Sequence, residues 1–132
     1  MATIFSKIIA GEIPCYKVAE DESHLAFLDV RPVKKGHVLA IPKKEIDYLF
    51  DMPEAEFLAL HNFARKVGIA VKSVIPCKRV GTAVVGLEVP HVHIHLIPLD
   101  SIEDISFTSP RLECSAEEFQ QVAANIAREV KL

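Results

Sequence analysis

Apolar positions along the chain change their spacing several times, and each change predicts a different element. Apolar residues three and four positions apart predict three helices, over residues 4–9, from Pro53 to just before Pro76, and over about 115–131. Short alternating or continuous apolar runs, bounded by polar residues, Gly or Pro, predict five strands, over residues 16–20, 25–30, 37–42, 78–85 and 91–98.

The order of these elements predicts the fold class. Strands dominate the middle of the chain, the helices are set apart from them, and most connections are short. This order is typical of an α+β fold in which a five-stranded, largely antiparallel sheet packs its helices on one face. A chain of 132 residues has the length of one ordinary domain.

Composition narrows the classes of partner. The net charge of −3 gives no basic surface, which disfavours a nucleic-acid polymer but permits a single nucleotide as ligand. Cys15, Cys77 and Cys114 are odd in number and widely spaced, which favours a reducing compartment. The chain shows no export signal and no apolar run of about 18 residues that could span a membrane. We therefore expect a cytoplasmic protein without a membrane partner.

The predicted strand over residues 91–98 carries the candidate chemistry. Successive side chains of a strand point to opposite faces, so His91, His93 and His95 share one face while apolar residues fill the other. Same-face neighbours lie roughly 6.6–7 Å apart, which lets neighbouring imidazoles act on one ligand. Three of the six histidines fall in this one pattern, and we interpret it as a functional site that faces away from the helices, on a concave or solvent-facing side of the sheet.

Three imidazoles on one face have two chemical uses. They can hold a metal ion, as in catalytic sites with three histidine ligands, but no further acidic or histidine ligand has a clear spacing. Alternatively, a neutral imidazole is a good nucleophile near pH 7, because its pKa of about 6.5 leaves a lone pair free. His24, in a predicted turn, and His61, on a helix face, are expected to be solvated.

Five ordered segments resemble the histidine triad (HIT) family of nucleotide hydrolases and transferases. They span residues 4–8, 12–14, 26–30, 36–43 and 91–98. The resemblance covers about residues 3–98, leaves the C-terminal helix as an extension, and is strongest to the Hint-like branch. It implies a homodimer whose sheet continues across both subunits. It also implies hydrolysis of nucleoside phosphoramidates, with purine nucleotides as the favoured substrates and with no cofactor.

The resemblance also assigns roles to individual residues. His93 corresponds to the nucleophile that attacks the α-phosphorus and forms a covalent nucleotidyl-histidine. His91, His95 and His37 correspond to residues that orient the nucleophile, and Asp29 to the acid that accepts the two ribose hydroxyls. The apolar walls around the base correspond to Ile4, Phe5, Ile8, Phe27 and Val30.

The chain departs from the family pattern at several positions. The family's Gln and Ser or Thr after the loop glycine are Leu87 and Glu88 here, and we hypothesise that Glu88 serves as the leaving-group acid. The phosphate-facing Asn or Gln expected before this loop is replaced by Val80 or a neighbour. Two alternatives stay open. One is a dinucleoside polyphosphate hydrolase, against which the loop lacks that branch's Gln. The other is a nucleotide-binding module with weak or no catalysis, which the altered loop supports.

A structural zinc found in some bacterial relatives is not expected here. Its ligands are two N-terminal cysteines, a later histidine and the first histidine of the triad. The first three positions hold Thr3, Ser6 and Glu45 in this chain. Because structural zinc needs four good ligands, we predict no metal.

Overall fold

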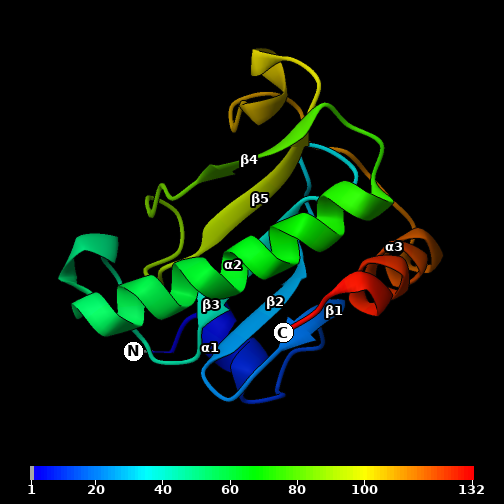
Figure 1. Cartoon of the computed structure of the whole chain (residues 1–132). Helices are drawn as coiled ribbons and strands as arrows, with labels where there is room; N and C mark the ends of the chain where they lie inside the picture. Colours follow the sequence, from blue (N-terminus) through cyan, green and yellow to red (C-terminus); the bar gives the residue numbers. More distant parts are fainter. Residues whose placement is uncertain (1) are drawn as a thin grey trace.

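Five antiparallel strands form one sheet in the protein, whose computed structural model describes residues 2–132 (Figure 1). The strands are β1 (Lys17–Glu20), β2 (His24–Leu28), β3 (Val38–Pro42), β4 (Arg79–Ala83) and β5 (Ile94–Leu99). The helices are α1 (Ile4–Ile9), α2 (Glu54–Val74) and α3 (Ala116–Glu129), with short 3₁₀ turns η1 (Leu49–Asp51) and η2 (Ile102–Ile105). The strand order is β1-β2-β3-β5-β4, and every neighbouring pair is antiparallel. The predicted fold class is confirmed.

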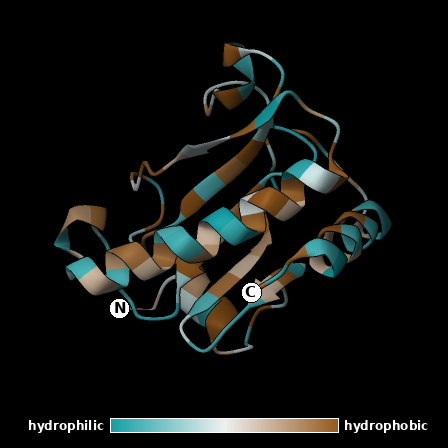
Figure 2. Cartoon of the chain, in the orientation of Figure 1, coloured by the Kyte–Doolittle hydropathy of each residue, from teal (hydrophilic) through white to brown (hydrophobic). Residues whose placement is uncertain are grey.

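The two faces of the sheet bury different apolar clusters. Even-numbered residues of β2, β3 and β5 pack with α2 and α3, and both long helices lie in front of the sheet in Figure 1. Odd-numbered residues such as Phe27 and Leu39 pack with Phe5 of α1, behind the sheet in that view. Helix α3 alternates between hydrophobic and hydrophilic residues, whereas hydrophobic colour predominates in β5 (Figure 2). The prediction of helices on one face thus holds for α2 and α3, while the short α1 covers the other.

The strand boundaries are narrower than the sequence predicts. β5 begins at Ile94, which is its first residue to pair with β3, so His91 and His93 precede the strand. The two residues still lie in an ordered stretch, because the Val92 N–H donates to the Ile46 carbonyl at 2.7 Å. β2 likewise ends at Leu28, before the predicted boundary at residue 30.

The predicted solvation of His24 is wrong. Its side chain is buried in β2, where the ring stacks on Phe63 of α2 at a centroid distance of 5.0 Å. Nδ1 lies 2.9 Å from a carboxylate oxygen of Asp21, which satisfies the polar side of the ring. An even position in β2 faces α2, and this parity decides its burial. His61 is exposed on α2, as predicted.

Gly36 fixes the approach to β3. Its φ of +90° lies in a region that only glycine adopts readily, and an added Cβ would lie 2.7 Å from Ile75 Cγ1. The chain therefore turns tightly against the end of α2 and delivers His37 to the start of β3. Within residues 2–132, no helix has the length and apolar character needed to cross a membrane.

Candidate active site

The predicted site residues of the sheet occupy odd-numbered positions, which lie on one face. Asp29 continues the odd positions of β2, His37 those of β3, and His95 lies in β5 opposite Leu39. The His93 ring reaches the same face, where it meets Phe5 of α1 edge-on at a centroid distance of 5.0 Å. The three triad histidines are buried, with 0%, 6% and 7% exposure for His91, His93 and His95. These rings lie on the face opposite α2 and α3, where Phe5 of α1 contacts His91 and His93 and Phe107 contacts His95.

Backbone hydrogen bonds determine the tautomer of His93. Its Nδ1 lies 2.7 Å from the carbonyl oxygen of His91, and a carbonyl can only accept, so Nδ1 carries the proton. In the neutral ring, Nε2 then holds a free lone pair. The ring of His91 is fixed in a similar way, since its Nε2 donates to the Pro42 carbonyl at 2.8 Å. His91 Nδ1 is buried without a hydrogen-bond partner.

A second chain of hydrogen bonds determines the tautomers of His37 and His95. The Val33 N–H donates to His37 Nδ1 at 3.2 Å, so this nitrogen is the acceptor. His37 Nε2 must then carry the proton and donate it to His95 Nδ1 at 2.9 Å. This leaves the N–H of neutral His95 on Nε2. His95 lies beside His93, with ring centroids 4.9 Å apart.

Burial keeps these imidazoles neutral. Desolvation, reinforced by the neighbouring histidines and Arg111, lowers the pKa of His37 to about 3 and that of His95 to about 4. Desolvation also lowers the pKa of His93, although the hydrogen bond to the His91 carbonyl opposes this shift. A lone pair on His93 Nε2 is therefore present throughout the neutral pH range.

A cavity of about 430 Å³ opens on this face of the sheet. Its volume lies within the usual range for small-molecule sites. The predicted residues that line it are Ile4, Phe5, Ile8, Phe27, Asp29, Val30, Glu88, His93 and His95. His91 and His37 do not line it and lie behind the other two histidines. The structure therefore brings all eleven predicted site residues together, nine at the cavity surface and two in support.

The family model described as HIT domain matches residues 10–102 of this chain. The chain belongs to the HIT family.

Individual HIT relatives extend over most of the chain. An uncharacterized HIT-like protein of Methanocaldococcus jannaschii is 45% identical over 105 residues, covering 72% of this chain and 77% of its own length. The adenosine 5′-monophosphoramidase of Schizosaccharomyces pombe is 32% identical, covering 99% of this chain and 100% of its own. A Zn-bound histidine triad family protein from Mycobacterium smegmatis has a TM-score of 0.80 and 26% identity, covering 97% of this chain and 95% of that one. The predicted family is confirmed.

The zinc ligands expected in some HIT proteins do not fit this chain. Thr3 and Ser6 bond each other in a capping box at the start of α1, with the Thr3 N–H donating to Ser6 Oγ at 2.7 Å. Glu45 is exposed. The unpartnered Nδ1 of His91 is the one atom of a metal-binding type left from the expected set, and one ligand does not hold zinc.

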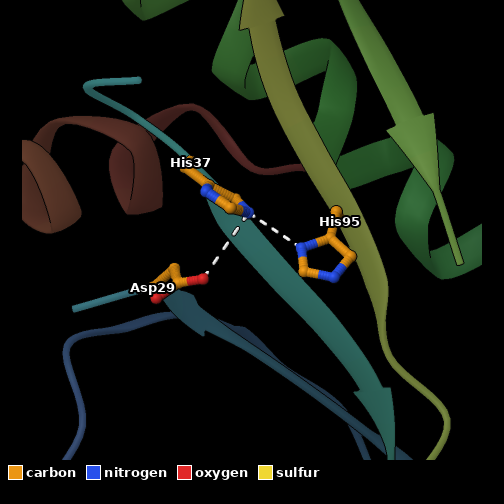
Figure 3. A group of neighbouring side chains, drawn as sticks. All are labelled: Asp29, His37 and His95. Atoms are coloured by element: carbon orange, nitrogen blue, oxygen red, sulfur yellow. Dashed lines mark hydrogen bonds and ion pairs between the residues drawn. The ribbon is translucent and has the colours of Figure 1, made fainter. Parts of the chain in front are cut away.

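A second group, formed by Asp29, His37 and His95, has the composition of a metal site (Figure 3). His37 lies between the other two, with Nε2 2.9 Å from His95 Nδ1 and 3.7 Å from Asp29 Oδ2. To bind a metal through Nε2, His37 would need a free lone pair there, and its proton would then have to sit on Nδ1. That proton would face the N–H of Val33, which donates to Nδ1. The arrangement therefore suits a hydrogen-bond relay and not a metal ion.

Phe107 and Arg111 are among the residues that line this HIT cavity and that sequence reasoning missed. Phe107 lies against the His95 ring with centroids 4.7 Å apart, and Arg111 places its guanidinium over Phe107 at 5.7 Å. Both follow the histidine strand, in the stretch beyond residue 98 that the family resemblance does not cover. An aromatic residue and an arginine in an otherwise polar loop were the available signal.

Proposed function

We propose that this HIT protein hydrolyses nucleoside phosphoramidates or related nucleotidyl conjugates to a nucleoside monophosphate, through a covalent nucleotidyl-His93 intermediate. The observation that carries the proposal is the tautomer of His93. Its Nδ1 proton is engaged by a backbone carbonyl, and its ring lines the cavity with a neutral Nε2. The S. pombe relative named as a phosphoramidase supports the same substrate class.

The reaction proceeds in two displacements. Nε2 of His93 forms a bond to the α-phosphorus while the phosphorus–nitrogen bond breaks, and the leaving amine takes a proton. Water then attacks the same phosphorus while the bond between His93 Nε2 and phosphorus breaks. The group that protonated the amine takes a proton from this water, the nucleoside monophosphate is released, and His93 returns to the neutral imidazole. Covalent catalysis of this kind divides one difficult step into two easier ones. The rigid hydrogen bond to the His91 carbonyl holds the nucleophile in place, which lowers the entropic cost of attack.

The other residues have supporting roles in this proposal. The relay from Val33 through His37 leaves the His95 N–H as a donor for a developing charge on phosphate. Asp29 accepts the ribose hydroxyls, and the apolar residues of α1 and β2 hold the base. Glu88 lies exposed at the cavity and delivers the leaving-group proton, either from its own carboxyl group or through a bridging water. The apolar walls carry no base-specific polar group, and purine nucleotides are the favoured substrates by analogy with the family.

The test uses adenosine 5′-phosphoramidate as substrate. Wild type is expected to release AMP, and His93→Ala is expected to lose turnover by about 10³-fold or more while it still binds AMP. His61→Ala, which removes an exposed imidazole on α2, is the matched control and should match wild type. Rapid quench into an alkaline denaturant, which preserves the acid-labile phosphorus–imidazole bond, should trap AMP covalently on wild type and not on His93→Ala.

Two other outcomes would replace the proposal. Turnover of diadenosine polyphosphates in preference to the phosphoramidate would identify a dinucleoside polyphosphate hydrolase. Tight AMP binding without turnover of either substrate would identify a binding module, an alternative that the replacement of the usual Ser or Thr by Glu88 favours.

A further inference from the structure

The segment that follows η2 folds back over the histidine face. Two hydrogen bonds attach it to the loop after β2: Arg111 Nη1 donates to the Arg31 carbonyl at 2.6 Å, and the Leu112 N–H donates to the Pro32 carbonyl at 2.9 Å. Between these attachments and η2, the Phe107 ring covers His95. The segment thus forms a wall of the cavity within the same chain.

Arg111 comes close to Asp29 through this attachment. Its Nη1 lies 3.9 Å from Asp29 Oδ2, and both side chains are only 17% exposed. The other Asp29 oxygen, Oδ1, accepts the N–H of Arg31 at 2.8 Å. Asp29 Oδ2 also faces His37, as Figure 3 shows. The carboxylate is therefore fixed on one oxygen by the backbone, and it has a guanidinium beside the other.

The charges around Asp29 make this guanidinium important. His37, His93 and Glu88 face the carboxylate from β3, from the stretch before β5, and from the loop between β4 and β5. Both histidines are neutral, and Glu88 is a like charge. Burial raises the pKa of Asp29, whereas the Arg31 N–H and Arg111 lower it. Arg111 is thus the fixed positive charge that favours the ionised carboxylate.

We propose that Arg111 is a positioning residue that keeps the Asp29 carboxylate ionised and oriented so that it accepts both ribose hydroxyls. The inference rests on the proposed function, because it takes Asp29 as the ribose acceptor. According to this inference, the preference for ribonucleotides depends on the pair formed by Asp29, just after β2, and Arg111, in the segment after η2. A protonated or rotated carboxyl accepts at most one of the two hydroxyls well, so ribose selectivity depends on Arg111.

The experiment measures binding of AMP and of 2′,3′-dideoxy-AMP, which lacks both hydroxyls. Two charge-assisted hydrogen bonds make wild type prefer AMP by at least about tenfold. Arg111→Gln is expected to reduce this preference by about three- to tenfold and leave the affinity for dideoxy-AMP nearly unchanged. Arg111→Lys, which keeps the positive charge, should restore most of the preference. Arg128→Gln, on the exposed side of α3, is the matched control.

The pH dependence separates this role from a purely structural one. In wild type the AMP preference should fall as the pH is lowered through the pKa of Asp29. In Arg111→Gln the pKa of Asp29 is higher, so the preference should begin to fall at a higher pH than in wild type. Asp29→Asn should remove the preference at every pH, and adding Arg111→Gln to it should produce no further loss of selectivity.

Three results would overturn the inference. An unchanged AMP preference in Arg111→Gln at all pH values would show that Arg111 does not act on Asp29. An equal loss of AMP and dideoxy-AMP binding would show that Arg111 contacts the phosphate or only supports the cavity wall. Failure of wild type to bind AMP would instead remove the proposed function itself, and the inference with it.

Discussion

At the scale of single residues, the site depends on which nitrogen of each histidine carries a proton. His93 donates from Nδ1 to a backbone carbonyl, and its burial lowers its pKa. In the proposed reaction, protonation of Nε2 would remove the lone pair that attacks phosphorus, so activity should fall as the pH decreases through this pKa. The direction of the shift places that fall below the usual value of about 6.5.

We therefore predict that kcat/KM for adenosine 5′-phosphoramidate falls to half its maximum only below pH 6.5. Rates corrected for spontaneous hydrolysis give the profile, and NMR titration of the histidine ring protons identifies the group. His95 and His37 should protonate with pKa values of about 4 and about 3. A half-maximal rate at or above pH 6.5 would contradict the prediction.

Glu88 provides a second prediction at this scale. It lines the cavity in the loop where the family usually has Ser or Thr, so it is placed to supply the leaving-group proton. Glu88→Gln should lower kcat by about 10²-fold for a strongly basic amine leaving group, and much less for a weakly basic one. Stopped-assay kinetics on such a pair of substrates measures the effect. Glu45→Gln, at an exposed position, is the control, and equal rates for Glu88→Gln and wild type would exclude the role.

At the scale of elements, the parity of the strands could be predicted from the sequence, but their limits could not. Alternation placed His91, His93 and His95 on one face, and the structure brings His93 beside His95 and both His91 and His93 against Phe5. Asp29 and His37 were placed by the family resemblance alone, and they continue the odd positions of β2 and β3 on this face. The start of β5 at Ile94 depends on where β3 stops pairing, which is a property of the partner strand. The exposure of His24 was predicted wrongly because the polar residues before it indicated a turn, whereas its burial comes from the distant helix α2.

Helix α1 has only six residues, so its N-terminal cap contributes much of its stability. Because α1 lines the cavity, we expect this cap to affect binding as well. Its capping box joins Thr3 to Ser6, and its Phe5 contacts both Phe27 and His93. Thr3→Ala should cost about 1 kcal/mol in the stability of this helix. Because α1 forms a wall of the cavity, we expect AMP affinity to fall by up to about fivefold, with kcat less affected.

Helix α3 supplies the matched control for this prediction. Ser115 and Glu118 form the same capping box there, away from the cavity. Ser115→Ala should lower stability by a similar amount and leave AMP affinity unchanged. Isothermal titration of AMP, together with thermal unfolding of both variants, checks the difference. Equal AMP affinity in the two variants would show that the cap of α1 does not support the nucleotide site.

At the scale of the whole molecule, the cavity combines segments that are distant in the sequence. Residues of α1, β2, the loop between β4 and β5, β5 itself and the segment after η2 meet there. The family resemblance ends near residue 98 and so does not cover the last of these walls. That wall, with Phe107 and Arg111, depends on the chain folding back over His95, which no local pattern encodes.

The outer edge of β4 is where we expect two copies of the chain to form a homodimer. β4 lies at one end of the sheet, where its free edge can pair with another strand. Beside it, a groove of about 680 Å³ between α2 and β4 is lined by apolar residues that include Val80, Val84 and Ile69, and Ile69 is 57% exposed. A two-fold axis through this edge would pair β4 with its copy and bury both grooves together.

Light scattering should therefore give twice the chain mass of 14.6 kDa at micromolar concentration. Ile69→Glu should shift the protein toward the single-chain mass, because the dimer would bury two unpaired carboxylates. Leu132→Glu changes an equally exposed apolar residue at the C-terminus and should leave the dimer intact. A wild-type protein that stays at the single-chain mass would show that the sheet ends at β4.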